Sequence, residues 1–170
     1  MTADTATPLV PDADRLYAST DEFVFGLDAT LVQRPEQKVA TVNVRDTIDG
    51  VEMTLIDNGM PVMVIAAASL GLRGDETPEE LDANASLKAR IEALRLKAAP
   101  LMNLGDVSRK PVPKITLVSA PRAGGAIATR TFIPHDVHTS IGVLGAVTVA
   151  TAAVLPGSVA YDVANPGQGD

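Results

Sequence analysis

The hydrophobic residues in the first half of the chain predict short strands. Val51, Met53 and Leu55 are separated by Glu52 and Thr54, which is the period-two pattern of a half-buried strand. The run Asp57-Asn58-Gly59 follows and predicts a tight turn, because Asn and Gly tolerate a positive φ. Further apolar runs predict strands over residues 39–44, 61–68, 114–120 and 127–133.

A helical pattern begins between these runs. Thr77-Pro78-Glu79-Glu80 is a capping box with proline at the first helical position. Apolar side chains then recur at mostly three- and four-residue spacing, at Leu81, Leu87, Ile91, Leu94, Ala98 and Leu101. Charged residues occupy most of the other positions, at Glu79, Lys88, Arg90, Glu92, Arg95 and Lys97. The pattern predicts an amphipathic outer helix with one buried stripe.

A second helix, predicted over residues 141–155, is apolar on every side. Such a helix needs protein around it, since a water-facing side would expose Val and Leu. It is shorter than the roughly 20 residues that span a bilayer, and it ends at Pro156-Gly157. We therefore predict an α+β fold in which a curved, mostly antiparallel sheet surrounds this central apolar helix.

Domain organisation follows from the same patterns. Residues 1–38 show little periodicity and form a poorly defined N-terminal segment, residues 39–160 form the domain, and residues 161–170 are a frayed tail. Met1–Pro11 lacks the basic and apolar regions of a signal peptide, so we expect a cytoplasmic protein without a membrane anchor.

Composition excludes several kinds of function. A net charge of -7 argues against a nucleic-acid partner, because binding to phosphates requires clustered Lys and Arg. The chain has 0 cysteines, which excludes disulfides, a thiolate nucleophile and a cysteine-ligated metal. Apolar residues make up 46% of the chain, enough to build a real core.

The most informative polar segment is His135–Ser140, directly before the apolar helix. The first N–H groups of a helix lack intrahelical partners and carry the positive end of its dipole, which favours an anion such as a carboxylate or phosphate. His138 has two interpretations, as a hydrogen-bond donor to that anion or as a capping or packing residue. Thr139 or Ser140 is the expected N-cap, which a ligand can share.

Other chemistry has weaker support in the sequence. His135 and His138, with Asp136 as a third group, fall short of the usual zinc ligand set, so we predict no metal. Ser140 lacks the surrounding Gly-x-Ser-x-Gly turn of a hydrolase nucleophile. Asn43 lies where a strand meets a loop, and turn chemistry does not explain it, so we consider it a ligand-facing residue.

Several blocks of the sequence resemble the second domain of the 4-oxalomesaconate tautomerase and 2-methylaconitate isomerase family (PrpF-like proteins). The blocks occur in family order and together cover about residues 40 to 160, with the better fit to the tautomerase branch. They are Asp49–Val62, Leu70–Leu81, Met102–Val107, Val112–Lys114, Gly124–His135 and His138–Val147.

The resemblance implies a diaminopimelate-epimerase-like fold of two similar domains, with the ligand between the N-termini of their central helices. It implies an isomerase that shifts a proton in an oxo- or tricarboxylic acid without metal or cofactor, in the breakdown of aromatic acids. The family lysine and cysteine belong to a first domain with no counterpart here, so the catalytic residues of this chain stay unknown. The implied substrate-binding residues are His138, Thr139, Ser140, Ile141, Gly142 and Asn43.

Two departures from the family pattern frame the functional hypotheses. Asp136 and Val137 stand where the family usually has Arg and Cys, and a carboxylate near an anion pocket would weaken binding. The leading hypothesis is the carboxylate-binding half of an isomerase, active only as a homodimer or with a partner chain that supplies the missing domain. The alternative is a non-catalytic domain that binds a polycarboxylate or a protein.

Overall fold

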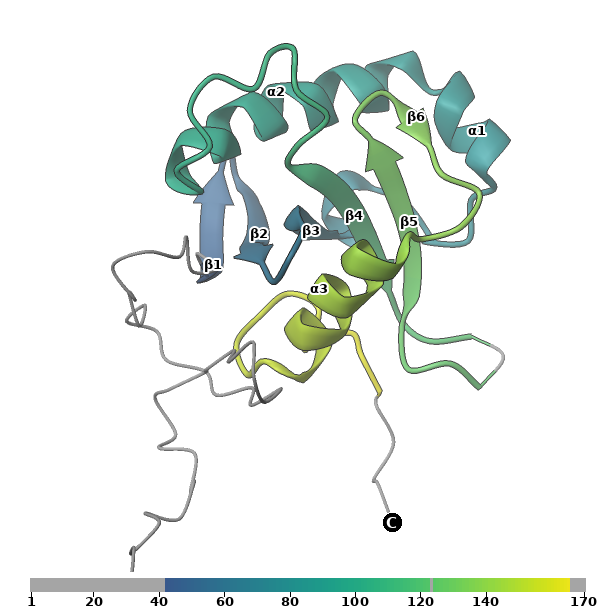
Figure 1. Cartoon of the computed structure of the whole chain (residues 1–170). Helices are drawn as coiled ribbons and strands as arrows, with labels where there is room; N and C mark the ends of the chain where they lie inside the picture. Colours follow the sequence, from purple (N-terminus) through teal and green to yellow (C-terminus); the bar gives the residue numbers. More distant parts are fainter. Residues whose placement is uncertain (1–41, 123, 166–170) are drawn as a thin grey trace, which may run out of the picture. The chain divides into compact units, whose positions relative to one another are not determined.

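The computed structural model describes residues 42–122 and 124–165, which all belong to one compact unit, Ala40–Asp170 (Figure 1). The predicted N-terminal segment, residues 1–38, lies outside the described residues. Within the described ranges, no helix combines the length and the hydrophobicity needed to cross a membrane.

The described strands form one six-stranded sheet whose spatial order, β1-β2-β3-β4-β5-β6, follows the chain. All neighbouring pairs are antiparallel except β3 and β4, which run parallel with Val62 opposite Lys114. The mostly antiparallel prediction is therefore confirmed. The strands are β1 Val42–Ile48, β2 Val51–Asp57, β3 Pro61–Ala66, β4 Lys114–Ser119, β5 Ala128–Ile133 and β6 Asp136–Val137.

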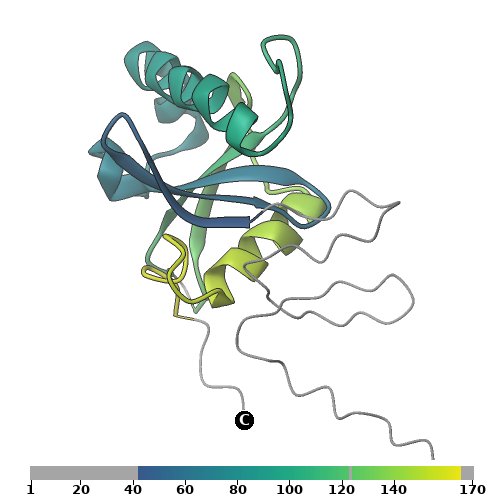
Figure 2. The same ribbon diagram turned by 90° about the vertical axis from the view of Figure 1, so that its left-hand side faces the viewer.

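Helices cover both faces of the sheet. The long connection between β3 and β4 contains a 3-10 turn, Ala67–Leu70, followed by α1, Pro78–Ala83, and α2, Ala85–Leu101. In Figures 1 and 2, α1 and α2 lie on one side of the sheet and α3, Val143–Val154, lies on the other. The domain is thus a three-layer α+β structure.

The capping box at Thr77 is confirmed, since Thr77 accepts from the N–H of Glu80 and the Glu80 side chain accepts from the N–H of Thr77. The single predicted helix is in fact two. Asn84 ends α1, and its side-chain oxygen accepts the N–H of Leu87 at 3.0 Å, which starts α2. An N-cap asparagine supplies the acceptor that the first turn of a new helix needs.

Alternate residues of the central strands contribute to two separate cores. Met53, Leu55, Met63 and Ile65 pack under α1 and α2, whereas Ile56, Val62 and Val64 pack against α3. The strand containing Thr54 is predicted from the sequence to be half-buried. Because helices cover both faces of the sheet, Thr54 is fully buried as well. Its hydroxyl donates to the carbonyl of Val44 at 2.7 Å, which satisfies the polar atom in the core.

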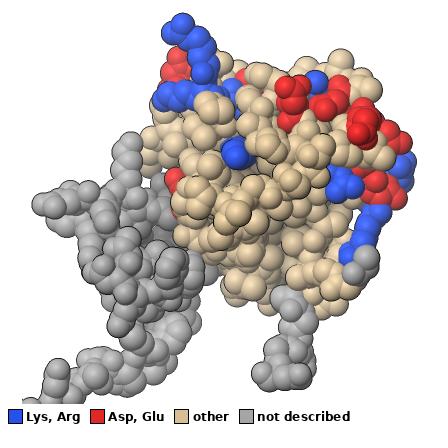
Figure 3. Space-filling view, turned by 45° about the vertical axis from the view of Figure 1, so that its right-hand side comes forward, with Lys and Arg blue, Asp and Glu red and all other residues tan. Residues whose placement is uncertain are grey.

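The prediction that the apolar helix is enclosed by protein is wrong for the described residues. One face of α3 packs on the sheet through Thr148, Val149, Ala152 and Ala153. The other face is open, with Val143 80%, Leu144 53% and Val154 57% exposed. α3 contains no charged residue, and in Figure 3 charged side chains gather mainly on the upper part of the described surface. The helix therefore presents an uncharged apolar surface.

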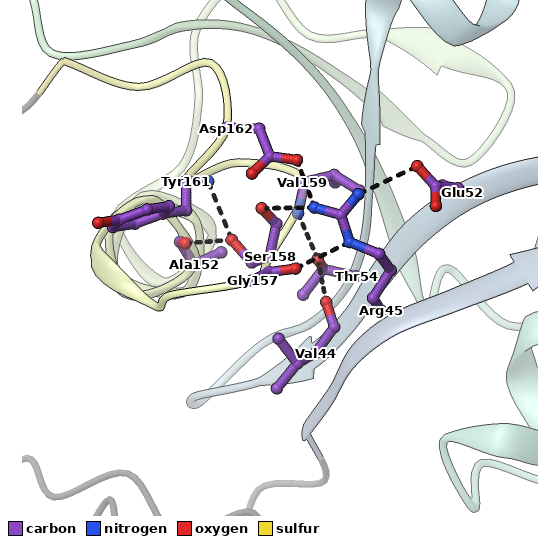
Figure 4. A network of polar contacts seen from close by, with 10 residues as sticks. All are labelled: Val44, Arg45, Glu52, Thr54, Ala152, Gly157, Ser158, Val159, Tyr161 and Asp162. Carbon is purple, nitrogen blue, oxygen red and sulfur yellow. Dashed lines mark hydrogen bonds and ion pairs between the residues drawn. The ribbon is translucent and has the colours of Figure 1, made fainter. Parts of the chain in front are cut away.

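Hydrogen bonds and ion pairs connect the segment after α3 to β1 and β2 (Figure 4). Arg45 donates to the carbonyls of Gly157 and Ser158 and pairs with Glu52 and Asp162. In the predicted tail, residues 161–165 are therefore attached to the domain, with the N–H of Asn165 also donating to the carbonyl of Ala126. Residues 166–170 lie outside the described residues.

Asp57, at the end of β2, gives the stability of the domain a pH dependence. Burial raises the pKa of the Asp57 carboxyl, and the N–H of Gly59 opposes this rise only in part. The folded state therefore keeps a proton that the unfolded state loses near pH 4, so the free energy of unfolding falls as the pH rises from about 4 to the raised pKa.

We expect Asp57→Asn to remove this downward slope, because the amide does not titrate. Urea unfolding at a series of pH values measures it. A difference between the variant and the original chain that stays constant with pH would contradict the prediction.

Candidate functional site

A pocket of about 240 Å³ lies where β5, the start of α1 and the connection from β6 to α3 meet. Four of the predicted substrate-binding residues line it together, and Gly142 follows them directly in the chain. The lining residues are Pro78, Thr129, Arg130, Thr131, His138, Thr139, Ser140 and Ile141.

The prediction that Thr139 or Ser140 caps the apolar helix is wrong. The N-cap of α3 is Gly142, which has no side chain to accept a bond, and the helix begins with the N–H of Ala146 donating to Gly142 at 2.8 Å. No hydrogen bond joins the hydroxyls of Thr139 and Ser140 to other described residues. These hydroxyls remain available to a ligand.

His138 is held by its backbone rather than its ring. Its N–H donates to the carbonyl of Thr131 on β5 at 2.8 Å, which fixes the loop against the strand. The His138 ring makes no hydrogen bond or ion pair with another described residue. The capping interpretation of His138 thus has no support among the described contacts.

Arg130 is a pocket residue that the sequence analysis missed. Its Nε donates to the carbonyl of Glu76 at 2.8 Å, and its Nη1 donates to the carbonyl of Thr129 at 2.9 Å. No carboxylate among the described residues lies within ion-pair distance of it. The signal available in the sequence was a lone charged residue within β5, whose other residues are uncharged. Arg130 makes the pocket positive.

Two other predicted residues lie elsewhere. Asp136 on β6 does not line the pocket: its side chain is 86% exposed, and its carboxylate lies 4.0 Å from Lys88 on α2. Asn43 lies on β1, at the opposite edge of the sheet, and donates to Asp46 at 2.7 Å beside a β-bulge. The structure does not bring Asn43 to the pocket.

The two histidines do not share the pocket. His135 does not line the pocket, and its Nδ1 lies 4.0 Å from the carboxylate of Glu92. Across residues 42–122 and 124–165, no group of three or more His, Cys, Asp or Glu side chains is arranged to hold a metal ion.

The arrangement suits a ligand with carboxylate groups. An arginine recognises a planar carboxylate through paired N–H donors, and charge-assisted hydrogen bonds of this kind are stronger than neutral ones. Hydroxyls of Thr and Ser and the His138 ring add further hydrogen-bonding groups around the same space. The pocket can therefore bind and orient an organic anion.

Comparison with known proteins places this geometry in a family. Residues 29–169 match the model of the PrpF protein family. The chain is 56% identical over 130 residues to a 4-oxalomesaconate tautomerase of Pseudomonas putida (strain KT2440), covering 76% of this chain and 36% of that protein. It is 58% identical over 122 residues to a (4E)-oxalomesaconate Delta-isomerase of Novosphingobium sp. (strain KA1), covering 72% and 34%. The chain therefore spans about a third of the length of these relatives.

The comparison of structures agrees with the comparison of sequences. A crystal structure of a methylitaconate-delta-isomerase superposes with a TM-score of 0.69 at 20% identity, covering 75% of this chain and 39% of that one. This likeness confirms the predicted diaminopimelate-epimerase-like fold class. On the family match and the identity to two isomerases, this chain belongs to the PrpF protein family, a family of isomerases.

Proposed function

We propose that this chain is the carboxylate-binding half of an isomerase that acts on a small oxo-tricarboxylic acid, by keto-enol tautomerisation of 4-oxalomesaconate. The observation that carries the proposal is the pocket in which Arg130 and His138 face a ligand space beside three threonines and a serine. The names of the relatives at 56% and 58% identity supply the substrate class.

The proposed reaction moves one proton from carbon to oxygen and shifts the double bond accordingly. It consumes no redox equivalent, so the proposal includes no cofactor. Arg130 would bind a substrate carboxylate and stabilise the negative charge that develops when the proton leaves. A proton shift also needs a positioned acid and base. Among the lining residues, His138 is the only imidazole, and there is no lysine or carboxylate.

We therefore propose that the catalytic base comes from outside the described residues, with a second polypeptide as one source. The open face of α3, with Val143 and Leu144 exposed, offers an apolar surface for such a chain. A homodimer is the form that needs no other component, and a partner chain carrying a first domain is the alternative.

The exposed face of α3 predicts self-association. Val143→Glu combined with Val147→Glu should make the chain monomeric, because two charges would be buried without partners in any contact through α3. Sedimentation velocity over a range of concentrations measures this. Leu96→Glu is the matched control, since Leu96 is an exposed apolar residue on α2, across the sheet. A chain that is monomeric at every concentration before mutation would contradict the homodimer.

A second candidate function is a non-catalytic domain that binds a polycarboxylate or a protein. The absence of cysteine from the chain and of lysine and carboxylate from the pocket lining favours it. The two candidates differ in turnover, and they share the ligand only if the non-catalytic domain binds a polycarboxylate.

The function is tested by mixing the full chain with 4-oxalomesaconate and following ultraviolet absorbance and thermal unfolding. We expect a rise in melting temperature with little or no turnover, and loss of that rise in His138→Ala. His135→Ala, a histidine outside the pocket, should keep it. Turnover by the chain alone would mean that two copies assemble a complete active site, and its absence would favour a partner chain as the source of the base. No rise in melting temperature, or an equal rise in His138→Ala, would contradict the proposal.

A further inference from the structure

In the loop between the 3-10 turn and α1, one side-chain carboxylate accepts hydrogen bonds from the backbone of the loop itself. The two oxygens of Glu76 accept the backbone N–H of Arg73 at 2.7 Å and of Gly74 at 2.8 Å. A carboxylate that accepts two backbone N–H groups from its own loop fixes the path of that loop. The Glu76 side chain therefore determines where the backbone of residues 73–76 lies.

The same loop is pressed against the sheet. A Cβ added to Gly74 would lie 2.4 Å from Ser119 on β4, so the loop and the strand leave no room for a side chain there. Asp75, next in the loop, pairs with Arg122 at 3.2 Å. The Glu76 carboxylate and the contact with the sheet therefore both fix the position of this loop.

The backbone carbonyl of Glu76 accepts Arg130 Nε at 2.8 Å. A guanidinium has five N–H donors, and the only other one that bonds to a described residue goes from Nη1 to the carbonyl of Thr129. These two carbonyls orient the planar group and leave its remaining donors for a ligand. The position of the Glu76 carbonyl therefore decides how Arg130 faces the pocket.

From these contacts we propose that Glu76 is a positioning residue for Arg130: its carboxylate folds the loop so that its carbonyl holds the guanidinium toward the ligand. The inference rests on the proposed function, because it assigns how the carboxylate-binding arginine is oriented. Nothing in Glu76 itself touches the pocket.

The ionised form of Glu76 is the one that serves this role. Burial acts to raise the pKa of the Glu76 carboxyl, but the N–H donors of Arg73, Glu76 and Gly74 outweigh it and hold that pKa below its usual range. Glu76→Gln keeps one acceptor oxygen and replaces the other with a donor, which cannot accept the second N–H.

A double-mutant cycle on the full chain tests the proposal, with tricarballylate as the probe and titration calorimetry as the measurement. We expect Glu76→Gln to weaken binding about five- to tenfold, the effect of losing one intramolecular hydrogen bond. In Arg130→Lys the Nε–H is absent, so adding Glu76→Gln should change the affinity by less than about twofold. Glu79→Gln, the same change three residues along the chain, should leave binding unchanged. An equal loss of affinity in both backgrounds would overturn the proposal.

A second readout does not depend on the ligand. We expect the Nε–H of Arg130 to exchange with solvent several-fold faster in Glu76→Gln than in the original chain, measured by ¹⁵N NMR. Unchanged exchange would overturn the positioning role. If the original chain does not bind tricarballylate, the proposed function fails, and the exchange measurement still decides whether Glu76 orients Arg130.

Discussion

Replacing Arg95 with alanine is expected to lower the free energy of unfolding by about 3–5 kcal/mol, the usual loss when one partner of a buried ion pair is removed. Arg95 on α2 is 0% exposed. Its Nε and one Nη2 proton bond both oxygens of Glu92, at 2.7 and 2.8 Å. The other donors go to the carbonyls of Val107 at 3.0 Å, Val112 at 2.8 Å and Lys110 at 3.2 Å.

The alanine variant would leave one carboxylate and three carbonyls without these donors, in addition to a cavity. Urea unfolding measures the loss. Arg90→Ala, an exposed arginine of the same helix, should change stability by no more than about 0.5 kcal/mol.

Arg95→Lys should recover little of the loss, because an ammonium cannot reproduce the planar five-donor arrangement. A loss below about 1 kcal/mol for Arg95→Ala would show that water or local movement replaces these bonds. In that case the segment before β4 would not depend on Arg95 for its position.

The second large effect is on binding. Arg130→Met should weaken binding of tricarballylate about 30- to 100-fold, or about 2–3 kcal/mol, the range for hydrogen bonds to a charged group. Methionine keeps much of the aliphatic stem but supplies neither positive charge nor N–H donors. Because Arg130 is only partly buried and bonds backbone carbonyls at the pocket edge, the melting temperature of the free chain should change little.

Arg109→Met is the control for a general loss of positive charge, since Arg109 is exposed and does not line the pocket. Equal weakening by Arg109→Met and Arg130→Met would mean that net charge, not the pocket, attracts the anion. Unchanged binding in Arg130→Met would remove this arginine from the site.

Much of the fold could be predicted because its signals are local. The Asn58-Gly59 turn places Gly59 at φ 90, and the capping box at Thr77 forms as its sequence indicates. Arg95 was placed on the wet face because only contacts with the distant segment around Val107 and Val112 make its burial favourable. The break at Asn84 was missed because an asparagine there is compatible with both a helix interior and an N-cap.

The site could be predicted in part for the same reason. His138 to Ile141 are contiguous in the chain, so one segment brings them to the pocket. The pairing of β5 with β4 and the bond to the Glu76 carbonyl place Arg130 at the pocket. No local sequence pattern reveals these two contacts. The open face of α3 departs from the enclosed helix predicted from the sequence, because an apolar helix pattern does not tell which of its sides contacts protein.

The most direct test of the carboxylate-binding pocket is an NMR titration of the full chain with tricarballylate, following every backbone amide. The proposed site predicts that the largest shifts occur at Thr129–Thr131 and His138–Gly142, with little change at Asn43 on the far edge of the sheet. Shifts centred elsewhere, or none at millimolar ligand, would contradict the assignment of this pocket as the substrate-binding site.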